Sequence, residues 1–330
     1  MEQTYQLDKL VLHIVFLLTL FIAKAQENLV PNGSFEEYYS CPESNDLNDG
    51  QLEHCKGWWK PTKGTSDYFN ECNHTIVSVP ANFWGYQQAF QGHGYVGIVP
   101  IEWNKTTGEI VAQEYIQTKL SRPLKPCTTF HLSFYVSCAD LSHYAIGKLG
   151  AYFSKHEIQG QTNQVLEFIP QVRNQQIISD TINWIKIESD FIATGGEEYL
   201  TIGYFSSNFA YDTMFIQTAS TPSVAPYYYI DSVSVIEIGE VDGCDIKIPN
   251  IFSPNSDGIN DQIDFSYLDG FEELDFRILN RWGNVIFKYD ANNIIWDGTT
   301  PNGEPCTDGV YFYVLNSKTT RKTGFIQLIR

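Results

Sequence analysis

The stretch from Pro249 to Arg330 is the most informative part of this sequence for predicting its fold. It reads PNIFSPNSDGINDQIDF at 249–265, LDFRILNRWGNVIFKYD at 274–290 and IIWDGTTPNGEPCTDGVYFYVLN at 294–316. From Leu274 to Ile278 apolar and charged residues alternate, which is the period of two expected for a half-buried strand. Gly283 with its flanking Asn residues then favours a tight turn into a return strand. The stretch has no helical period, so it predicts a small antiparallel all-β domain.

Four motifs of this stretch resemble the gliding motility-associated C-terminal domain of Bacteroidota. The resemblance implies an Ig-like β-sandwich over 249–330 that acts as a sorting signal. It implies the type IX secretion machinery of the outer membrane as a partner, and a secreted or outer-surface protein that passes through the periplasm. The matching residues are Pro254-Asn255-x-Asp257-Gly258-x-Asn260-Asp261, Asn280-Arg281-Trp282-Gly283, Trp296-Asp297-Gly298 and Gly309-Val310-Tyr311-x-Tyr313.

The first 25 residues have the pattern of a secretory signal peptide. The apolar run Leu10 to Ala23 is 14 residues long, shorter than the roughly 20 residues needed to cross a bilayer core. The small pair Ala23-x-Ala25 favours cleavage after Ala25. We therefore expect no transmembrane segment after signal removal, and the alternative is an uncleaved membrane anchor.

Charge and composition narrow the class of protein. The chain has a formal net charge of −18 and an isoelectric point near 4.7, which argues against nucleic acid and anionic membranes as partners. Its 20 Tyr, 21 Phe and 7 Trp suit either the core of a β-sandwich or stacking platforms for sugars. The 305 residues after position 25 are enough for two hydrophobic cores.

The ends of the segment 26–238 predict the fold of the N-terminal domain. Its opening LVPNGSFEEY and closing YYYIDSVSVIEI resemble the first and last strands of carbohydrate-binding (galactose-binding-like) jelly rolls. That resemblance implies a jelly-roll β-sandwich with a structural calcium held by Glu36 and Asp231, supplemented by backbone carbonyls. The alternative is that both are ordinary acids at strand ends. Residues 239–248 are expected to be the linker to the second domain.

An aromatic region in the first half of the domain is the candidate ligand-binding site. Flat aromatic rings can cover the apolar faces of a sugar, while amides and carboxylates bind its hydroxyl groups. The alternative is that these rings fill the sandwich core. The candidate ligand-binding residues are Trp58, Trp59, Asp67, Tyr68, Asn70, Trp84 and Tyr86.

All seven cysteines lie after the signal peptide, and export favours disulfides. Cys127 and Cys138 bracket an expected strand, so they would lie roughly 35 Å apart at ~3.3 Å per residue, too far for a bond. We favour a disulfide between Cys244 and Cys306. The partners of the others are undecided, and a zinc site at Cys41, Cys55 and Cys72 lacks a C-x-x-C pair.

No catalytic signature is present in the sequence. It has neither the H-E-x-x-H pattern of zinc proteases nor the G-x-S-x-G elbow of serine hydrolases. Adjacent acids such as Glu197 and Glu198 would point to opposite faces of a strand, so they make no glycosidase pair. The sequence predicts a non-enzymatic exported binding protein, either an adhesin or a glycan-binding accessory module. The alternatives are a secreted hydrolase acting on polysaccharide or peptide, and a purely structural surface component.

Overall fold

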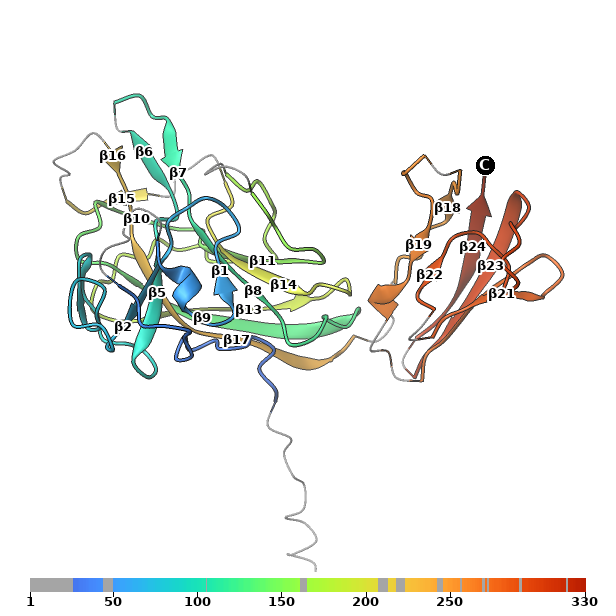
Figure 1. Ribbon diagram of the computed structural model, residues 1–330, viewed down its shortest axis with the longest axis horizontal. Helices are drawn as coiled ribbons and strands as arrows, with labels where there is room; N and C mark the ends of the chain where they lie inside the picture. Colours follow the sequence, from blue (N-terminus) through green and yellow to red (C-terminus); the bar gives the residue numbers. More distant parts are fainter. Residues whose placement is uncertain are drawn as a thin grey trace, which may run out of the picture.

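In the computed structural model the protein is built from two β-sandwich domains (Figure 1). The structure describes residues 26–43, 50–104, 106–160, 165–206, 213–217, 223–241, 246–255, 257–268, 271, 273–290, 293–318 and 320–330. Within these ranges the only helices are two short 3-10 turns, η1 (Leu52–His54) and η2 (Ser266–Leu268). The all-β fold class expected from the sequence is confirmed. The proposed signal peptide, 1–25, lies outside the described residues.

The N-terminal domain consists of two five-stranded antiparallel sheets that face each other across a core, as expected for a jelly roll. The first sheet has the order β13-β9-β17-β5-β2 and the second has the order β1-β8-β14-β11-β12. The first sheet contains β2 (Asp67–Asn70), β5 (Gly94–Ile98), β9 (Thr128–Cys138), β13 (Ile185–Ile192) and β17 (Tyr228–Glu240). The second contains β1 (Trp58–Trp59), β8 (Tyr115–Lys119), β11 (Gly150–Ser154), β12 (Val172–Arg173) and β14 (Tyr199–Gly203).

Alternation along the strands places the core between these sheets. On β9, Phe130, Leu132, Phe134 and Val136 all point inward and are fully buried, while the residues between them face outward. The connections between these strands contain short hairpins and ribbons. They are β3 (Ala81–Asn82) with β4 (Gly85–Tyr86), β6 (Glu102–Asn104) with β7 (Ile110–Ala112) and β16 (Ser223–Val224), and β10 (Tyr144–Ile146) with β15 (Thr213–Phe215).

The C-terminal domain packs a five-stranded sheet against a two-stranded one. The larger sheet has the order β18-β24-β23-β20-β21, and β19 pairs with β22 in the smaller. One pairing differs from the expected antiparallel pattern, because β18 runs parallel to β24. The strands are β18 (Ile251–Phe252), β19 (Ile263–Asp264), β20 (Asp275–Leu279), β21 (Val285–Lys288), β22 (Ile295–Trp296), β23 (Gly309–Asn316) and β24 (Arg321–Leu328).

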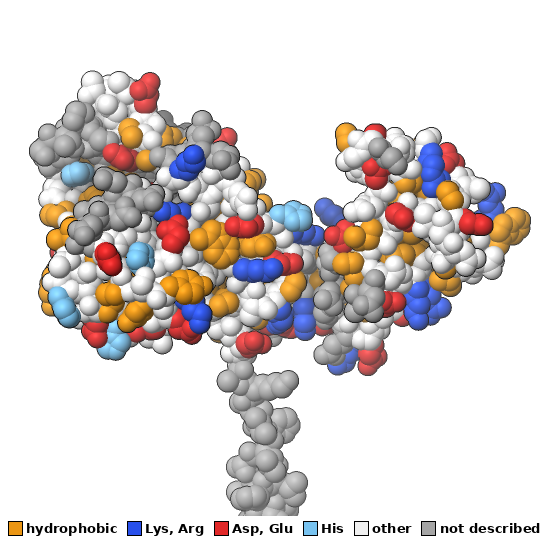
Figure 2. All heavy atoms as spheres, in the orientation of Figure 1, with side chains coloured by type: hydrophobic (Ala, Val, Ile, Leu, Met, Phe, Trp, Pro, Cys, Tyr) orange, Lys and Arg blue, Asp and Glu red, His pale blue; other side chains and the backbone are white. Residues whose placement is uncertain are grey.

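The two domains touch through a small contact beside the linker, and Figure 2 shows a hollow between them. Lys155 of the N-terminal domain places its Nζ 4.9 Å from the centre of the Tyr267 ring. Cys127 packs into the core of the C-terminal domain together with Ile246. A cavity of about 310 Å³ lies at this junction.

The cysteines correct one prediction from the sequence. Cys306 is a buried free thiol, so the expected bond between Cys244 and Cys306 is wrong. The Val241 N–H donates to the Cys127 carbonyl at 2.8 Å, so the chain enters the linker beside Cys127 rather than beside Cys306. Cys127 is itself disulfide-bonded.

The remaining cysteines resolve questions that the sequence left open. Cys41 and Cys72 form a disulfide with a Cα–Cα distance of 6.0 Å, while Cys55 and Cys138 are buried free thiols. The exclusion of a bond between Cys127 and Cys138 is confirmed. Among the described residues, no helix is long and apolar enough to span a membrane.

Candidate functional site

The aromatic residues chosen from the sequence do not form one site. Trp58 is 2% exposed and its indole N–H donates to the Asn32 carbonyl at 3.0 Å. Tyr68 is fully buried and its hydroxyl donates to the Phe35 carbonyl at 2.8 Å. Because both rings lie in the core between the sheets, the expectation that they contact a ligand is wrong.

Asp67 and Asn70 are also internal. The Asp67 carboxylate accepts a 2.6 Å hydrogen bond from the Tyr227 hydroxyl, and the Asn70 amide donates to the Tyr68 hydroxyl at 2.9 Å. Their exposed fractions are only 6% and 3%. They satisfy the polar ends of buried tyrosines, and neither side chain can reach a ligand.

Three of the predicted residues keep some surface, at separate places. Trp84 is half-buried and stacks on Tyr227 with the ring centres 4.3 Å apart. Tyr86 is 58% exposed, and its N–H donates to the Asp140 carboxylate. Trp59 lies on the outer face of the second sheet, so these rings make no continuous platform.

On that outer face a segment of the chain covers a row of aromatic and polar residues. Strand register aligns Trp59, Gln117, Thr201 and Tyr152 across β1, β8, β14 and β11. We call residues 155–160 and 165–172 the covering segment. Its Phe168 ring lies parallel to the Tyr152 ring, with the centres 4.5 Å apart.

Backbone groups of the covering segment form hydrogen bonds with a polar side chain beneath it. The Gln117 amide donates to the Ile158 carbonyl and its oxygen accepts from the Ile158 N–H, both at 3.0 Å. Three buried polar atoms on and beside this face nevertheless have no hydrogen-bond partner. They are Trp59 Nε1, Thr62 Oγ1 and Thr201 Oγ1.

An open groove lies on the opposite side of the domain, over the outer face of the first sheet. It has a volume of about 560 Å³. The Phe90 ring, 43% exposed, stacks on the Tyr135 ring of β9 with the centres 3.6 Å apart. Polar groups surround the rings, and those lining the groove include Asn28, Asn32, Glu36, Gln91, Ser133 and Lys186.

The loop that carries Phe90 is fixed by the two acids that the sequence singled out as calcium ligands. Asp231 accepts hydrogen bonds from the N–H groups of Phe90 at 2.8 Å and Gln91 at 3.0 Å. Glu36 accepts from the N–H groups of His93 at 2.8 Å and Gly94 at 3.0 Å. The two carboxylates therefore hold one loop from both ends, and this loop forms one wall of the groove.

Burial is the largest influence on the pKa of Asp231. The side chain is fully buried, which raises its pKa to about 7, although the N–H groups of Gln91, Ser232 and Phe90 act in the opposite direction. The neighbouring Glu36 adds to the rise. Because no surface of Asp231 is accessible, it can position the loop but cannot touch a ligand in the groove.

Calcium at Glu36 and Asp231 stays a proposal. Two carboxylates side by side are suitable oxygen ligands, but calcium needs six to eight oxygens. Here the carboxylates already accept backbone N–H bonds, and the described residues contain no group of three or more His, Cys, Asp or Glu side chains able to hold a metal ion. Backbone carbonyls would have to supply most of the shell.

Sequence reasoning missed the residues that line the groove. Phe90 sits in a loop without any pattern, and Tyr135 lies on the strand expected between Cys127 and Cys138. They meet because β9 runs past the loop held by Asp231. The one signal in the sequence is the pair Glu36 and Asp231, which predicts a metal site and in the structure holds this loop.

The C-terminal domain matches a known family. Residues 246–328 match the model described as CHU_C Type IX secretion signal domain. This is the secretion signal that the four motifs predicted. The match indicates an exported protein that reaches the cell surface or the medium. No curated protein sequence matches the chain significantly.

Solved structures similar to the chain include carbohydrate-binding modules and adhesin domains. The CBM22-1 xylan-binding domain from Paenibacillus barcinonensis Xyn10C is 16% identical with a TM-score of 0.33, and the match covers 66% of this chain and 99% of that one. The K1 cleaved adhesin domain of Lys-gingipain from Porphyromonas gingivalis W83 is 16% identical with a TM-score of 0.30, covering 56% and 92%. The CBM22-1-CBM22-2 tandem of the same Paenibacillus protein is 14% identical with a TM-score of 0.35, covering 91% and 64%. At these scores and identities the likeness carries no functional argument.

Proposed function

We propose that the N-terminal domain is a glycan-binding module, delivered to the cell surface or the medium by the C-terminal domain, and that it binds in the groove beside Phe90. The observation that carries the proposal is the exposed Phe90 ring, supported from behind by Tyr135 and bordered by polar side chains. The apolar face of a sugar ring can pack on Phe90. Hydroxyl, amide and charged groups beside it can bind the sugar hydroxyls.

The geometry favours binding over catalysis. A glycosidase needs two carboxyl groups that both reach the scissile bond. Of the carboxyl groups at the groove, Asp231 is inaccessible, Glu36 is bound to two backbone N–H groups, and Glu37 is paired with Lys56 at 2.7 Å. The groove is also rigidly formed, because the loop carrying Phe90 is held at both ends. A preformed concave site with a few fixed polar groups is typical of ligand binding.

The test is a binding screen of the full-length mature protein against soluble polysaccharides such as xylan, β-glucan, galactan and bacterial surface polymers, measured by affinity electrophoresis and calorimetry. We expect Phe90→Ala to weaken binding about tenfold, which corresponds to roughly 1.4 kcal/mol. Tyr86→Ala is the matched control, since Tyr86 is an exposed ring at a separate place.

The outcomes separate the alternatives. Binding that depends on Tyr86 and not on Phe90 would move the site to the aromatic region predicted from the sequence. A folded protein that binds none of the polymers would favour a structural surface component. Release of reducing ends or peptides from a substrate would favour a hydrolase.

A further inference from the structure

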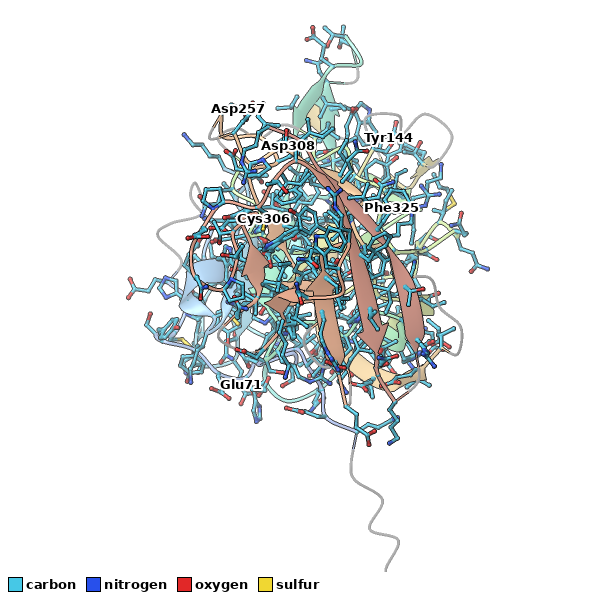
Figure 3. All side chains as sticks on the ribbon, turned by 90° about the vertical axis from the view of Figure 1, so that its right-hand side faces the viewer. Glu71, Tyr144, Asp257, Cys306, Asp308 and Phe325 are labelled. Carbon is cyan, nitrogen blue, oxygen red and sulfur yellow. A yellow bond between two sulfur atoms is a disulfide. The ribbon has the colours of Figure 1, made fainter. Side chains whose placement is uncertain are left out.

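The outer face of the larger sheet in the C-terminal domain carries an exposed apolar row. The inward residues of this sheet, such as Phe276 and Tyr313, form the core of the domain. Strand register aligns the outward residues Val285, Leu279, Phe312 and Phe325 across β21, β20, β23 and β24. Figure 3 shows this sheet in front of the N-terminal domain, with Phe325 labelled on the last strand.

Large apolar side chains of this row are open to solvent. Val285 is 40% exposed, Phe312 is 48% exposed and Phe325 is 50% exposed. Val310, 43% exposed, lies two positions from Phe312 on the same face of β23. A contiguous exposed apolar patch on a secreted domain marks an interaction surface more often than an isolated exposed residue does.

The N-terminal domain does not account for this patch. The contacts between the domains run through Tyr267 and Ile246, which lie beside the linker. The row lies on the outward side of the sheet, while the smaller sheet and the core lie on the inward side. The patch is therefore left for another molecule.

The charges around the row set the chemistry of that molecule. Arg277, Lys288 and Arg321 are exposed outward residues of the same sheet, and Asp275 is the acid that pairs with Arg277. This face is thus cationic within a chain whose net charge is −18. Pairing of this face with the same face of a second copy would bring like charges together, whereas a partner surface bearing carboxylates around an apolar centre is complementary.

We propose that this face is the surface by which the type IX secretion machinery binds the C-terminal domain. A domain that serves as a secretion signal has to be bound by the apparatus that exports it, and residues 246–328 match such a domain. Phe312 and Phe325 are the main contacts, because they are the largest side chains of the row and register places them side by side. Lys288 and Arg321 pair with acidic residues at the rim of the partner.

The test follows export of the full-length chain in a Bacteroidota host with an active type IX system. The double variant Phe312→Ser/Phe325→Ser removes both aromatic rings of the row without touching the core. We expect the fraction delivered to the surface or medium to fall about tenfold, because a few large side chains carry most of the binding energy of an interface, and the protein to accumulate in the periplasm. Ile295→Ser is the control, an apolar residue of the smaller sheet that is 40% exposed.

A second variant tests the same face in case the first variant fails to fold. Lys288→Glu/Arg321→Glu keeps every apolar contact and reverses two charges, and it is also expected to reduce export. Melting of each purified variant checks that the domain is folded.

Deletion of 249–330 tests the secretion role itself, since normal surface delivery without it would overturn that role. If the deletion blocks export but both face variants are exported like Ile295→Ser, the assignment of this face is wrong. If the variants change only the oligomeric state in gel filtration, with export unaltered, the face is a self-association surface and the proposal is likewise overturned.

Discussion

Glu36 and Asp231 lie near opposite ends of the sequence of the N-terminal domain, yet both accept hydrogen bonds from the same short loop. Asp231 accepts the N–H groups of Phe90 and Gln91, and Glu36 accepts those of His93 and Gly94. The loop turns between these contacts at Gly92, whose φ is +71°. A side chain at position 92 would place its Cβ 2.1 Å from the Glu36 carboxyl carbon. The arrangement therefore requires glycine at this position for two separate reasons.

Gly92→Ala should destabilise the domain and weaken binding in the groove. Positive φ alone costs a side-chain-bearing residue roughly 1–2 kcal/mol. Gly108→Ala is the matched control, because Gly108 has a φ of +74° and no atom within 4 Å of the added Cβ. We expect the loss of unfolding free energy to be larger for Gly92→Ala, measured by chemical denaturation. Equal losses would mean that the contact with Glu36 contributes nothing.

Calcium binding by Glu36 and Asp231 can be tested through the melting temperature of the protein. We expect added calcium to raise the melting temperature of the wild-type protein, because a ligand that binds only the folded state stabilises it. Glu36→Gln keeps an oxygen acceptor for the His93 and Gly94 N–H groups but removes the charge that attracts the ion. The calcium response should therefore disappear in that variant. A wild-type melting temperature that is the same in calcium and in chelator would remove the metal proposal and leave the N–H contacts as the whole role of these acids.

The covering segment hides a polar atom whose removal should stabilise the protein. Thr201 is fully buried and its hydroxyl has no hydrogen-bond partner. Thr118, on the neighbouring strand, is equally buried but donates to the Gly57 carbonyl at 2.8 Å. We expect Thr201→Val to raise the unfolding free energy by about 1 kcal/mol and Thr118→Val to lower it by about 1 kcal/mol. Changes of the same sign in both variants would contradict the difference in pairing.

The sequence predicted strands well because strand alternation is local. The strand expected between Cys127 and Cys138 and the alternating pattern at Leu274 to Ile278 become β9 and β20 with shifts of at most one residue at each end. Site residues were harder to predict, because composition does not tell whether a ring faces the core or solvent. Trp58 and Trp59 are adjacent, yet one is in the core and the other lies on the outer face. Phe90 and Tyr135 meet only through the long-range register of the first sheet.

Stability should depend on pH through Asp67. Burial raises the pKa of Asp67 well above its usual value, with Glu114 nearby adding to the rise. Because the folded state holds this proton more tightly than the unfolded state, the contribution of Asp67 to stability is fully present below about pH 4 and is lost as the pH rises through the folded-state pKa. One such group contributes a slope of up to about 1.4 kcal/mol per pH unit.

The variant Asp67→Asn isolates that contribution. Asn keeps an oxygen that accepts from the Tyr227 hydroxyl but does not ionise. We expect its unfolding free energy to fall less with rising pH than that of the wild type, measured by denaturation at a series of pH values. Asp180→Asn serves as the control of opposite sign, because N–H groups of Asn183 and Ile182 lower the pKa of that exposed acid. Parallel pH profiles for wild type and Asp67→Asn would show that Asp67 ionises as freely in the folded state as in the unfolded one.

Thiol counting distinguishes the cysteine pairing of the structure from the pairing expected from the sequence. The native protein should react slowly with thiol reagents, because Cys55, Cys138 and Cys306 are all buried. Burial also raises the pKa of the Cys306 thiol, which lowers the fraction present as reactive thiolate.

After unfolding without reductant, the structure predicts these three thiols. The variant Cys306→Ser should then expose one thiol fewer, because Cys306 is unpaired. If Cys244 were bonded to Cys306 instead, the same substitution would release the Cys244 thiol and raise the number. Mass spectrometry of the alkylated, unreduced protein reads this difference directly. Separately, loss of the bond between Cys41 and Cys72, which are 31 residues apart in sequence, should cost about 3–4 kcal/mol of unfolding free energy.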